Sequence, residues 1–277
     1  MIELSDKVGI VTGGASGIGE ATVRTMALLG AKVVIADVDM DRAEAIAAEL
    51  GKSVAAVRAD ITEEGDIAAM VAFTVARFGG LDILHNNAGI PRTRAPDFEV
   101  TQMPLDKWNL TLAAHLTSVM LGAKHALPHI ITRGGGAIVN TSSGGALSAT
   151  VDLTAYSSAK AGLHQLTREI AATYGRNNVR CNAVVPGAVM TDRARKTMTP
   201  EMLQLWADET PLPRLSSAQD IANVAVFLMS DASRMINGQS ISVDGGMMTK
   251  LPYWLMKMRD SRGPAFDAAR YVYETPQ

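Results

Sequence analysis

The sequence predicts an α/β protein built on a doubly wound, Rossmann-type parallel sheet of about seven strands, with helices on both faces. Short β-branched runs alternate with longer helical patterns, and the runs are apolar throughout rather than at every second position. This combination is typical of a parallel sheet buried on both sides. The expected strands lie at 8–11, 32–36, 53–58, 81–85, 137–141, 179–185 and 239–243. The expected helices lie between them at 17–29, 40–50, 63–78, 104–130, 154–177 and 217–229.

The chain of 277 residues has the length of one large α/β domain. It contains no internal repeat, low-complexity tract or linker rich in Pro or Ser, so we predict a single dinucleotide-binding catalytic domain over 1–246. The remaining 247–277 form a C-terminal extension whose first part is strongly apolar, with Met247, Met248, Leu251, Tyr253, Trp254, Leu255 and Met256. Such a segment needs a surface to cover. We expect it to pack on the substrate cleft or on a neighbouring subunit, and the sequence leaves both open.

Composition excludes several classes of partner. The 26 Lys and Arg nearly balance the 28 Asp and Glu, which gives no electrostatic footprint for nucleic acid or an anionic membrane. The single cysteine, Cys181, excludes an internal disulfide and a multi-cysteine metal site, and we expect no bound metal. No uncharged apolar stretch reaches the roughly 18 residues that span a bilayer, and no signal-like segment precedes the first strand. We expect a cytoplasmic protein.

Small and polar residues follow six of the predicted strands. They are Thr12 with Gly13, Asp37, Asp60, 86–89, Ser143, and Pro186 with Gly187. Turns favour Gly, Asn and Asp, which accounts for any one of these positions but poorly for all of them together. In an open α/β sheet the ligand crevice lies beyond the carboxyl ends of the strands. The six strands are therefore expected to place these residues along one ligand-binding edge.

Three glycines after the first strand predict a turn that holds a pyrophosphate. Without side chains, Gly13, Gly17 and Gly19 let the backbone approach a phosphate at a helix N-terminus. Their spacing differs from the usual G-x-G-x-x-G fingerprint. Asp37 ends the second strand, where a carboxylate accepts hydrogen bonds from ribose hydroxyls and repels a 2′-phosphate. We therefore expect NAD rather than NADP.

Tyr156 and Lys160 are four residues apart, which places a phenol and an ammonium on one face of a helix. Many such pairs are ordinary surface neighbours. A nearby cation favours the phenolate, so we expect a lowered pKa for Tyr156. Ser143, which ends an apolar run 13 residues upstream, adds a hydroxyl. Together with the glycine turn, these groups indicate hydride transfer with a nicotinamide cofactor.

With these motifs in order along about 5–246, the chain resembles the short-chain dehydrogenase/reductase family. The segment 12–19 is similar to the family's Thr-Gly-x-x-x-Gly-x-Gly loop, and 86–89 to its Asn-Asn-Ala-Gly motif. Ser143, Tyr156 and Lys160 match the catalytic serine and Tyr-x-x-x-Lys. Further matches are Pro186-Gly187 with Thr191, which resembles the segment that grips the nicotinamide carboxamide, and 243–246, which resembles the last strand and its exit.

The resemblance implies roles for individual residues. Ser143 would hydrogen-bond the reacting oxygen, Tyr156 would exchange the proton, and Lys160 would hold the nicotinamide ribose. Asp60 and Ile61 would contact the adenine edge, and Ser16 and the Ile18 amide the pyrophosphate. The full set expected to bind the cofactor is Gly13, Ser16, Gly17, Ile18, Gly19, Asp37, Asp60, Ile61, Asn87, Ala88, Gly89, Tyr156, Lys160, Pro186, Gly187, Val189 and Thr191.

His115 departs from the family pattern. The family usually has Asn here, in a long helix, where it supports a helix kink and a water relay to the lysine. Histidine can also donate and accept hydrogen bonds, and it titrates near neutrality. We include His115 among the catalytic candidates, either as a relay group or as a structural replacement.

The predicted function is interconversion of a secondary alcohol and a ketone with NAD(H). We expect a bulky, apolar substrate, with cyclic, terpenoid and steroid-like compounds as the candidates, and family resemblance implies a homotetramer. The segments expected to enclose the substrate offer Ile90, Gly144, Leu147, Val151, Leu153, Met202, Leu205 and Trp206. Alternatives are a dinucleotide-sensing regulator on the same fold, an epimerase or dehydratase, and an enzyme working mainly in the direction of ketone reduction.

Overall fold

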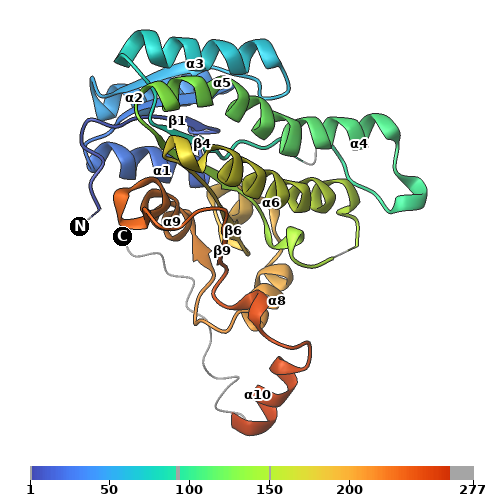
Figure 1. Ribbon diagram of the computed structural model, residues 1–277. Helices are drawn as coiled ribbons and strands as arrows, with labels where there is room; N and C mark the ends of the chain where they lie inside the picture. The colour runs from blue at the N-terminus through green and yellow to red at the C-terminus, as the bar shows by residue number, and fades with distance from the viewer. Residues whose placement is uncertain (1, 92–93, 150, 263–277) are drawn as a thin grey trace.

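The computed structural model describes residues 2–91, 94–149 and 151–262, and Figure 1 shows their central parallel sheet. Its strand order is β3-β2-β1-β4-β5-β6-β9, and every pairing is parallel. The strands are β1 (Val8–Thr12), β2 (Lys32–Asp37), β3 (Val54–Arg58), β4 (Ile83–Asn86), β5 (Gly136–Thr141), β6 (Val179–Pro186) and β9 (Ser240–Val243). The chain order reverses between β1 and β4, which is where such sheets bind dinucleotides.

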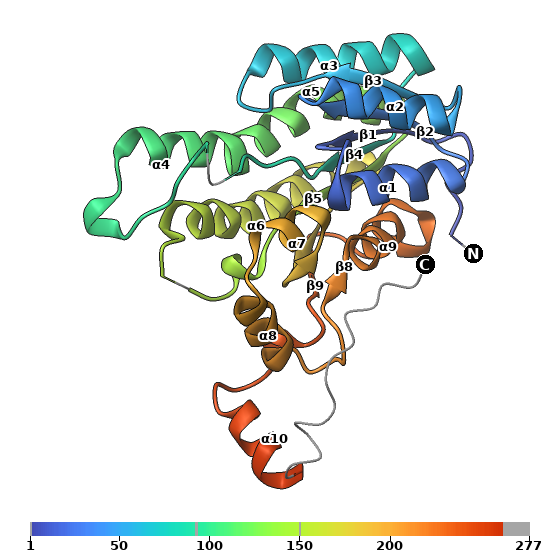
Figure 2. The same cartoon turned by 180° about the vertical axis from the view of Figure 1, so that it is seen from behind.

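Helices cover both faces of this sheet, as the two opposite views show (Figures 1 and 2). One face packs against α1 (Gly17–Leu28), α2 (Met40–Leu50) and α9 (Ala218–Met229). The other packs against α3 (Glu64–Phe78), α5 (Ser118–Thr132) and α6 (Thr154–Tyr174). The predicted doubly wound fold class is confirmed.

Aliphatic side chains fill the two layers between sheet and helices. Val23 and Met26 of α1 pack with Ile35 of β2 on one side, and Met70 of α3 packs with Leu84 of β4 on the other. Continuously buried strands explain why the sequence shows unbroken apolar runs. Cys181 of β6 is fully buried and its pKa is raised to about 12 by that burial, so its thiol packs rather than reacts.

The predicted helix over 104–130 is interrupted in the structure. It consists of α4 (Leu105–Leu112), a π-helical turn η2 (Ala113–Thr117) and α5. Single π turns are frequent at functional sites because they change the direction of side chains within a helix. Here the turn carries His115, the residue that departs from the family pattern.

The segment between β6 and α9 has structure that the sequence patterns did not reveal. It forms β7 (Val189–Met190), α7 (Asp192–Thr197), α8 (Pro200–Glu209) and β8 (Ser216–Ser217), with β7 and β8 paired as a small second sheet. Short 3₁₀ turns complete the described chain: η1 (Val100–Gln102), η3 (Gly144–Ala146), η4 (Gly175–Asn177), η5 (Asp231–Ser233) and η6 (Met247–Thr249).

The C-terminal extension begins at η6 and continues into α10 (Trp254–Arg262). In both views α10 projects from the body beyond α8 (Figures 1 and 2). Lys250 pairs with Glu209, and Arg259 pairs with Asp208, so two ion pairs tie the extension to α8. The rest of the extension, from 263 onward, lies outside the described residues.

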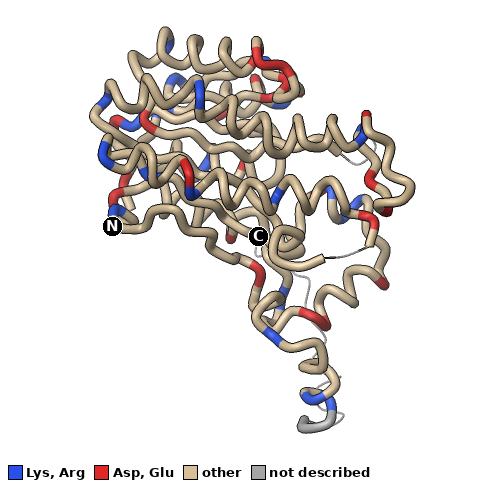
Figure 3. The backbone as a smooth tube through the Cα atoms, turned by 45° about the vertical axis from the view of Figure 1, so that its right-hand side comes forward, with Lys and Arg blue, Asp and Glu red and all other residues tan. Residues whose placement is uncertain are grey.

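Charges of both signs are interleaved along the chain, as Figure 3 shows, in keeping with the near-neutral net charge. Among the described residues, no helix is both long and apolar enough to cross a bilayer. The same residues contain no group of three or more His, Cys, Asp or Glu that could hold a metal ion.

Candidate active site

The carboxyl ends of β1, β2, β4, β5 and β6 meet at one edge of the sheet, where the polar and small residues expected there come together. The first contribution is the turn between β1 and α1. Gly13 and Gly17 have φ angles of +64° and +54°, a region that suits glycine. A Cβ at Gly19 would overlap the carbonyl oxygen of Gly13. The three glycines therefore permit a tight turn that leaves α1 open at its N-terminus for a phosphate.

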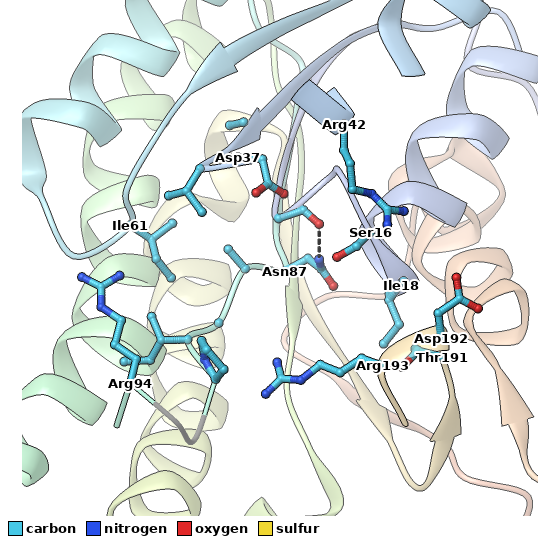
Figure 4. Close-up of a pocket in the computed structure, with 18 of the residues that line it drawn as sticks. Ser16, Ile18, Asp37, Arg42, Ile61, Asn87, Arg94, Thr191, Asp192 and Arg193 are labelled. Carbon is cyan, nitrogen blue, oxygen red and sulfur yellow. Dashed lines mark hydrogen bonds between the residues drawn. The ribbon is translucent and has the colours of Figure 1, made fainter. Parts of the chain in front are cut away.

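Thr12 and Asn87 join the ends of β1 and β4. The Thr12 hydroxyl accepts hydrogen bonds from the backbone amides of Asn87 (3.0 Å) and Ala88 (3.1 Å). The Asn87 amide nitrogen in turn donates to the carbonyl of Thr12 at 3.1 Å and weakly to that of Gly13 at 3.4 Å, the dashed line of Figure 4. The Asn-Asn-Ala-Gly motif thus stabilises the glycine turn from behind.

A cavity of about 570 Å³ opens in front of this turn (Figure 4). Eleven of the residues expected to bind a cofactor line it: Gly13, Ser16, Gly17, Ile18, Asp37, Asp60, Ile61, Asn87, Ala88, Gly89 and, from the opposite side, Thr191. Gly19 lies behind the turn. Pro186 and Gly187 at the end of β6, and Val189 in β7, do not line the cavity. The volume is in the range of small-molecule and cofactor sites.

Asp37 is held by backbone amides at the far end of this cavity. Its two carboxylate oxygens accept from Ala15 at 2.9 Å and from Asp39 at 3.0 Å. Arg42 folds back to the same place, where it donates to the Ala15 carbonyl at 3.0 Å and pairs with Glu20 at 3.1 Å. The carboxylate suits ribose hydroxyls, and the guanidinium beside it is occupied by two protein acceptors.

Three further basic side chains around the cavity were not expected from the sequence. They are Arg94, Arg193 and Lys196, which line the cavity together with Arg42. Arg94 pairs with Asp60 at 3.1 Å across the expected adenine edge, and Arg193 reaches across the opening from α7 (Figure 4). They lie in loops and a short helix without a recognisable motif, so only the folded chain shows that they surround an anion-binding cavity.

Tyr156, Ser143 and Lys160 converge at the next part of the sheet edge. Burial raises the pKa of Tyr156, whereas its hydrogen bond with Ser143 acts in the opposite direction. The Lys160 ammonium lies 5.8 Å from the centre of the phenol ring and donates to the Thr141 carbonyl at 2.7 Å. The expectation that Lys160 lowers the pKa of Tyr156 is therefore wrong for the protein alone, because desolvation dominates.

Lys160 is buried although it carries an amine. Burial lowers its pKa from 10.5 to about 8. Burying a cation lowers the free energy of unfolding, and such buried ionisable groups are characteristic of functional sites. Its location between β5 and the phenol ring explains the Tyr-x-x-x-Lys spacing on α6.

His115 lies against Tyr156 but does not titrate near neutrality. Their rings meet edge to face with centres 5.0 Å apart. Burial, and then the nearby Lys160, lower the pKa of His115 to about 3, while a hydrogen bond to the Ile90 backbone acts the other way. The expectation of a group that titrates between pH 5 and 8 is wrong, since the imidazole stays neutral throughout that range.

Asp97 is a site residue that the sequence analysis missed. Leu153, at the N-cap of α6, has no side-chain acceptor for the first helical amides. The buried Asp97 carboxylate fills that role from the distant 94–104 loop, accepting from Ala155 at 3.1 Å and Tyr156 at 2.8 Å. Asp97 thereby fixes the start of the helix that carries the phenol.

Replacing Asp97 with alanine is expected to lower the free energy of unfolding by about 0.5–2 kcal/mol, the range for a lost helix cap. Because the first turn of α6 would loosen around Tyr156, we expect kcat to fall as well. Thermal unfolding and steady-state kinetics test both effects. Asp106→Ala, which removes a carboxylate that is 71% exposed, is the control. An Asp97→Ala protein with unchanged melting temperature would contradict the capping role.

A second cavity of about 200 Å³ lies beside Tyr156. It is lined by Ile90, Ala95, Asp97, Thr111, His115, Leu153, Tyr156 and Arg193, of which Ile90 and Leu153 were expected in a substrate pocket. Leu147, Val151, Met202 and Leu205 are instead exposed by 45–77% and lie outside it, and Gly144 and Trp206 do not line it either.

Comparisons with known proteins agree with this geometry. Residues 13–248 match the family model described as enoyl-(acyl carrier protein) reductase. The chain is 36% identical over 255 residues to a 7α-hydroxysteroid dehydrogenase of Bacteroides fragilis, covering 91% of this chain and 98% of that one. It is 39% identical over 249 residues to a 2,5-dichloro-2,5-cyclohexadiene-1,4-diol dehydrogenase of Sphingobium indicum, covering 89% and 98%.

The fold also matches a solved structure of a 7α-hydroxysteroid dehydrogenase complexed with NADH and 7-oxo glycochenodeoxycholic acid. The TM-score is 0.84 at 34% sequence identity, covering 88% of this chain and 95% of that one. The chain therefore belongs to the short-chain dehydrogenase/reductase family, as an NAD-dependent enzyme that interconverts a secondary alcohol and a ketone.

Proposed function

We propose that the physiological substrate is a bulky, largely apolar cyclic alcohol or its ketone. The observation that carries this proposal is the pairing of the Ser143–Tyr156 hydrogen bond with the adjoining cavity, whose walls include Ile90, Ala95 and Leu153. The relatives support it, since their names specify steroid and cyclohexadiene alcohols. A regulator that only senses NAD would not need these catalytic side chains.

The roles of the side chains follow from their positions. Ser143, which already hydrogen-bonds Tyr156, orients the alcohol oxygen against the phenol. Tyr156 removes the alcohol proton in oxidation and returns it to the carbonyl oxygen in reduction. Lys160, anchored on the Thr141 carbonyl, holds the cofactor ribose in this proposal. NAD supplies the hydride acceptor, and the residues around the 570 Å³ cavity would hold it.

A screen of NAD reduction tests this proposal directly. Cyclohexanol, decalols and 7α-hydroxysteroids would be compared with short open-chain alcohols of equal concentration. We expect kcat/KM to rise with ring size, because each buried CH₂ contributes about 0.8 kcal/mol to binding. Higher efficiency with small polar alcohols would contradict the apolar substrate class without affecting the proton-transfer roles.

Selectivity for NAD over NADP is part of the same proposal, with Asp37 as its cause. Asp37→Ala is expected to reduce the ratio of kcat/KM values for NAD and NADP by at least about tenfold, because it removes a carboxylate that repels the 2′-phosphate. Arg42 would then be the neighbouring cation available to that phosphate. Asp41→Ala, an exposed carboxylate outside the cavity, is the control. An unchanged ratio in Asp37→Ala would contradict this assignment.

We further propose that the C-terminal extension helps to enclose the substrate. Its first part reaches the loop that follows Ser143, where the Met248 sulfur lies 4.0 Å from the Ser148 hydroxyl. The exposed Met202 and Leu205 of α8 and Leu251 of the extension leave apolar surface that a closing movement or a neighbouring subunit would cover.

Truncation after Gly246 distinguishes these two roles. A lid predicts loss of activity on large alcohols, by about tenfold or more, with the oligomer intact. Dissociation without that loss would instead identify the extension as a strap between subunits. Light scattering and kinetics on one preparation measure both.

The assembly and location are also proposals. We propose a homotetramer with α5 and α6 at one interface, supported by Met120, a large apolar side chain of α5 that is 41% exposed. We propose a cytoplasmic location, supported by the single, buried Cys181, which suits a reducing compartment.

A further inference from the structure

Two residues that line the same small cavity each carry a buried polar atom without a partner. Within the described part of the chain, neither Nδ1 of His115 nor Oγ1 of Thr111 has a hydrogen-bond partner. The two side chains are 6% and 3% exposed, and both line the 200 Å³ cavity beside Tyr156. An unsatisfied buried polar group costs about 1–3 kcal/mol, so two in one cavity indicate a ligand that satisfies them.

The helix geometry places these two side chains on one face. Thr111 belongs to the last turn of α4, and His115, four residues later, lies in the π turn that follows. Residues at this spacing share one face of a helix. Gly89 makes room for the imidazole, because a Cβ there would lie only 2.7 Å from Cε1 of His115. The chain is therefore built to hold a ring at this position.

The hydrogen-bonding character of the pair is specific. A neutral imidazole has one donor and one acceptor nitrogen. The Ile90 backbone hydrogen bond takes the donor, which leaves Nδ1 of His115 as an acceptor. The Thr111 hydroxyl can donate or accept. A group that both donates and accepts satisfies the two together, and an alcohol hydroxyl is such a group.

A water molecule or a carboxylate group would fit this cavity less well than an alcohol hydroxyl on a ring. Its volume of about 200 Å³ is several times the roughly 30 Å³ of one water molecule, and it has the size of a ring-bearing fragment. An ionised carboxylate only accepts hydrogen bonds, so it could not donate to the lone pair of Nδ1. It would also be repelled by the carboxylate of Asp97, which lines the same cavity. Arg193 at the same cavity is the one feature that would favour it.

We propose that this cavity is a subsite for a second hydroxyl group of the substrate, which donates to Nδ1 of His115 and accepts from Oγ1 of Thr111. The inference rests on the proposed function and narrows it from cyclic alcohols to cyclic diols. Tyr156 borders the same cavity, so one hydroxyl reaches the phenol while the other reaches the helix. His115 and Thr111 are then specificity-determining residues.

The test compares cyclohexane-1,4-diol with cyclohexanol as substrates of the full chain with NAD. We expect kcat/KM for the diol to be about 10–100-fold higher, well beyond the factor of two that two equivalent carbinol carbons give. In Thr111→Val, which keeps the shape and removes the hydroxyl, this preference should fall about 5–10-fold. His115→Phe, which keeps a ring against Tyr156, should reduce the same preference.

The matched control is Thr117→Val, an exposed threonine on the same π turn, which should leave the preference at the wild-type value. Equal efficiency with diol and cyclohexanol would overturn the subsite while leaving the alcohol dehydrogenase function intact. A preference that persists in Thr111→Val would also overturn it. Turnover of no alcohol at all would overturn the proposed function, and the subsite with it.

A third substrate, 4-hydroxycyclohexanecarboxylate, separates hydroxyl from acid recognition. The proposal expects lower kcat/KM for this acid than for the diol. A higher value that falls in Arg193→Met but not in Thr111→Val would show that the cavity binds an anion through Arg193, and would contradict the hydroxyl subsite.

Discussion

Replacing Tyr156 with phenylalanine is expected to lower kcat by about 10²–10⁴-fold, the usual contribution of a positioned general acid or base. The phenol oxygen hydrogen-bonds Ser143 and is the group that exchanges the proton in the proposed mechanism. The ring itself would remain packed between His115 and the Lys160 side chain, 5.0 Å and 5.8 Å away. Since Tyr156 does not line the 570 Å³ cavity, we expect NADH affinity to stay nearly unchanged.

Steady-state kinetics and an NADH fluorescence titration measure these two effects separately. Tyr174→Phe is the matched control, because Tyr174 ends the same helix about 27 Å from Tyr156 along its axis. It should retain wild-type kcat. Turnover by Tyr156→Phe within a few-fold of wild type would contradict proton transfer through the phenol.

Replacing Lys160 with methionine is expected to abolish turnover yet raise stability near pH 7. The shift of the Lys160 pKa from 10.5 to about 8 corresponds to about 3 kcal/mol of destabilisation while the amine is charged. Methionine removes that destabilisation. It also leaves the Thr141 carbonyl without its hydrogen-bond donor, which lowers the free energy of unfolding by about 1–1.5 kcal/mol. The net gain should be about 1–2 kcal/mol.

The pH dependence of the free energy of unfolding tests whether the buried charge of Lys160 causes this difference in stability. Between about pH 8 and 10.5 the unfolded chain keeps the Lys160 proton that the folded protein has released, so wild-type stability rises with pH across this window. The gain in stability of Lys160→Met should therefore be largest below pH 8 and reverse to a loss of up to about 1–1.5 kcal/mol above pH 10.5, where only the lost hydrogen bond remains. Denaturant unfolding at pH 7 and pH 10 measures it.

Lys124→Met, which removes a lysine that is 57% exposed, should change stability little at either pH. A Lys160→Met protein less stable than wild type at pH 7 would show that burial of the amine is not the destabilising factor. Equal gains at both pH values would exclude its titration as the cause.

The sheet and the cofactor turn could be predicted because their signals are local. The runs that became β1 and β2 are apolar throughout, since both faces of their strands are buried. Gly13 and Gly17 were recognisable because their φ angles suit glycine. The spacing of Tyr156 and Lys160 needed only the period of one helix.

Residues brought to the site from elsewhere in the chain could not be predicted. Asp97 caps α6 from a position 58 and 59 residues away, and no local pattern distinguishes it from other loop carboxylates. Arg193 belongs to a short helix within a segment of weak periodicity. The expected apolar wall was partly misplaced for the same reason, as Leu147 and Met202 are exposed.

The sequence by itself determined the fold class, the glycine turn and the candidate catalytic side chains, because each depends on residue type and on spacing within one element. Only the tertiary structure decided the pKa values of these side chains. Burial raises the pKa of Tyr156 and lowers those of Lys160 and His115, which reverses two expectations drawn from unburied side chains. Desolvation depends on what surrounds a group in space, and that environment comes from several distant elements at once.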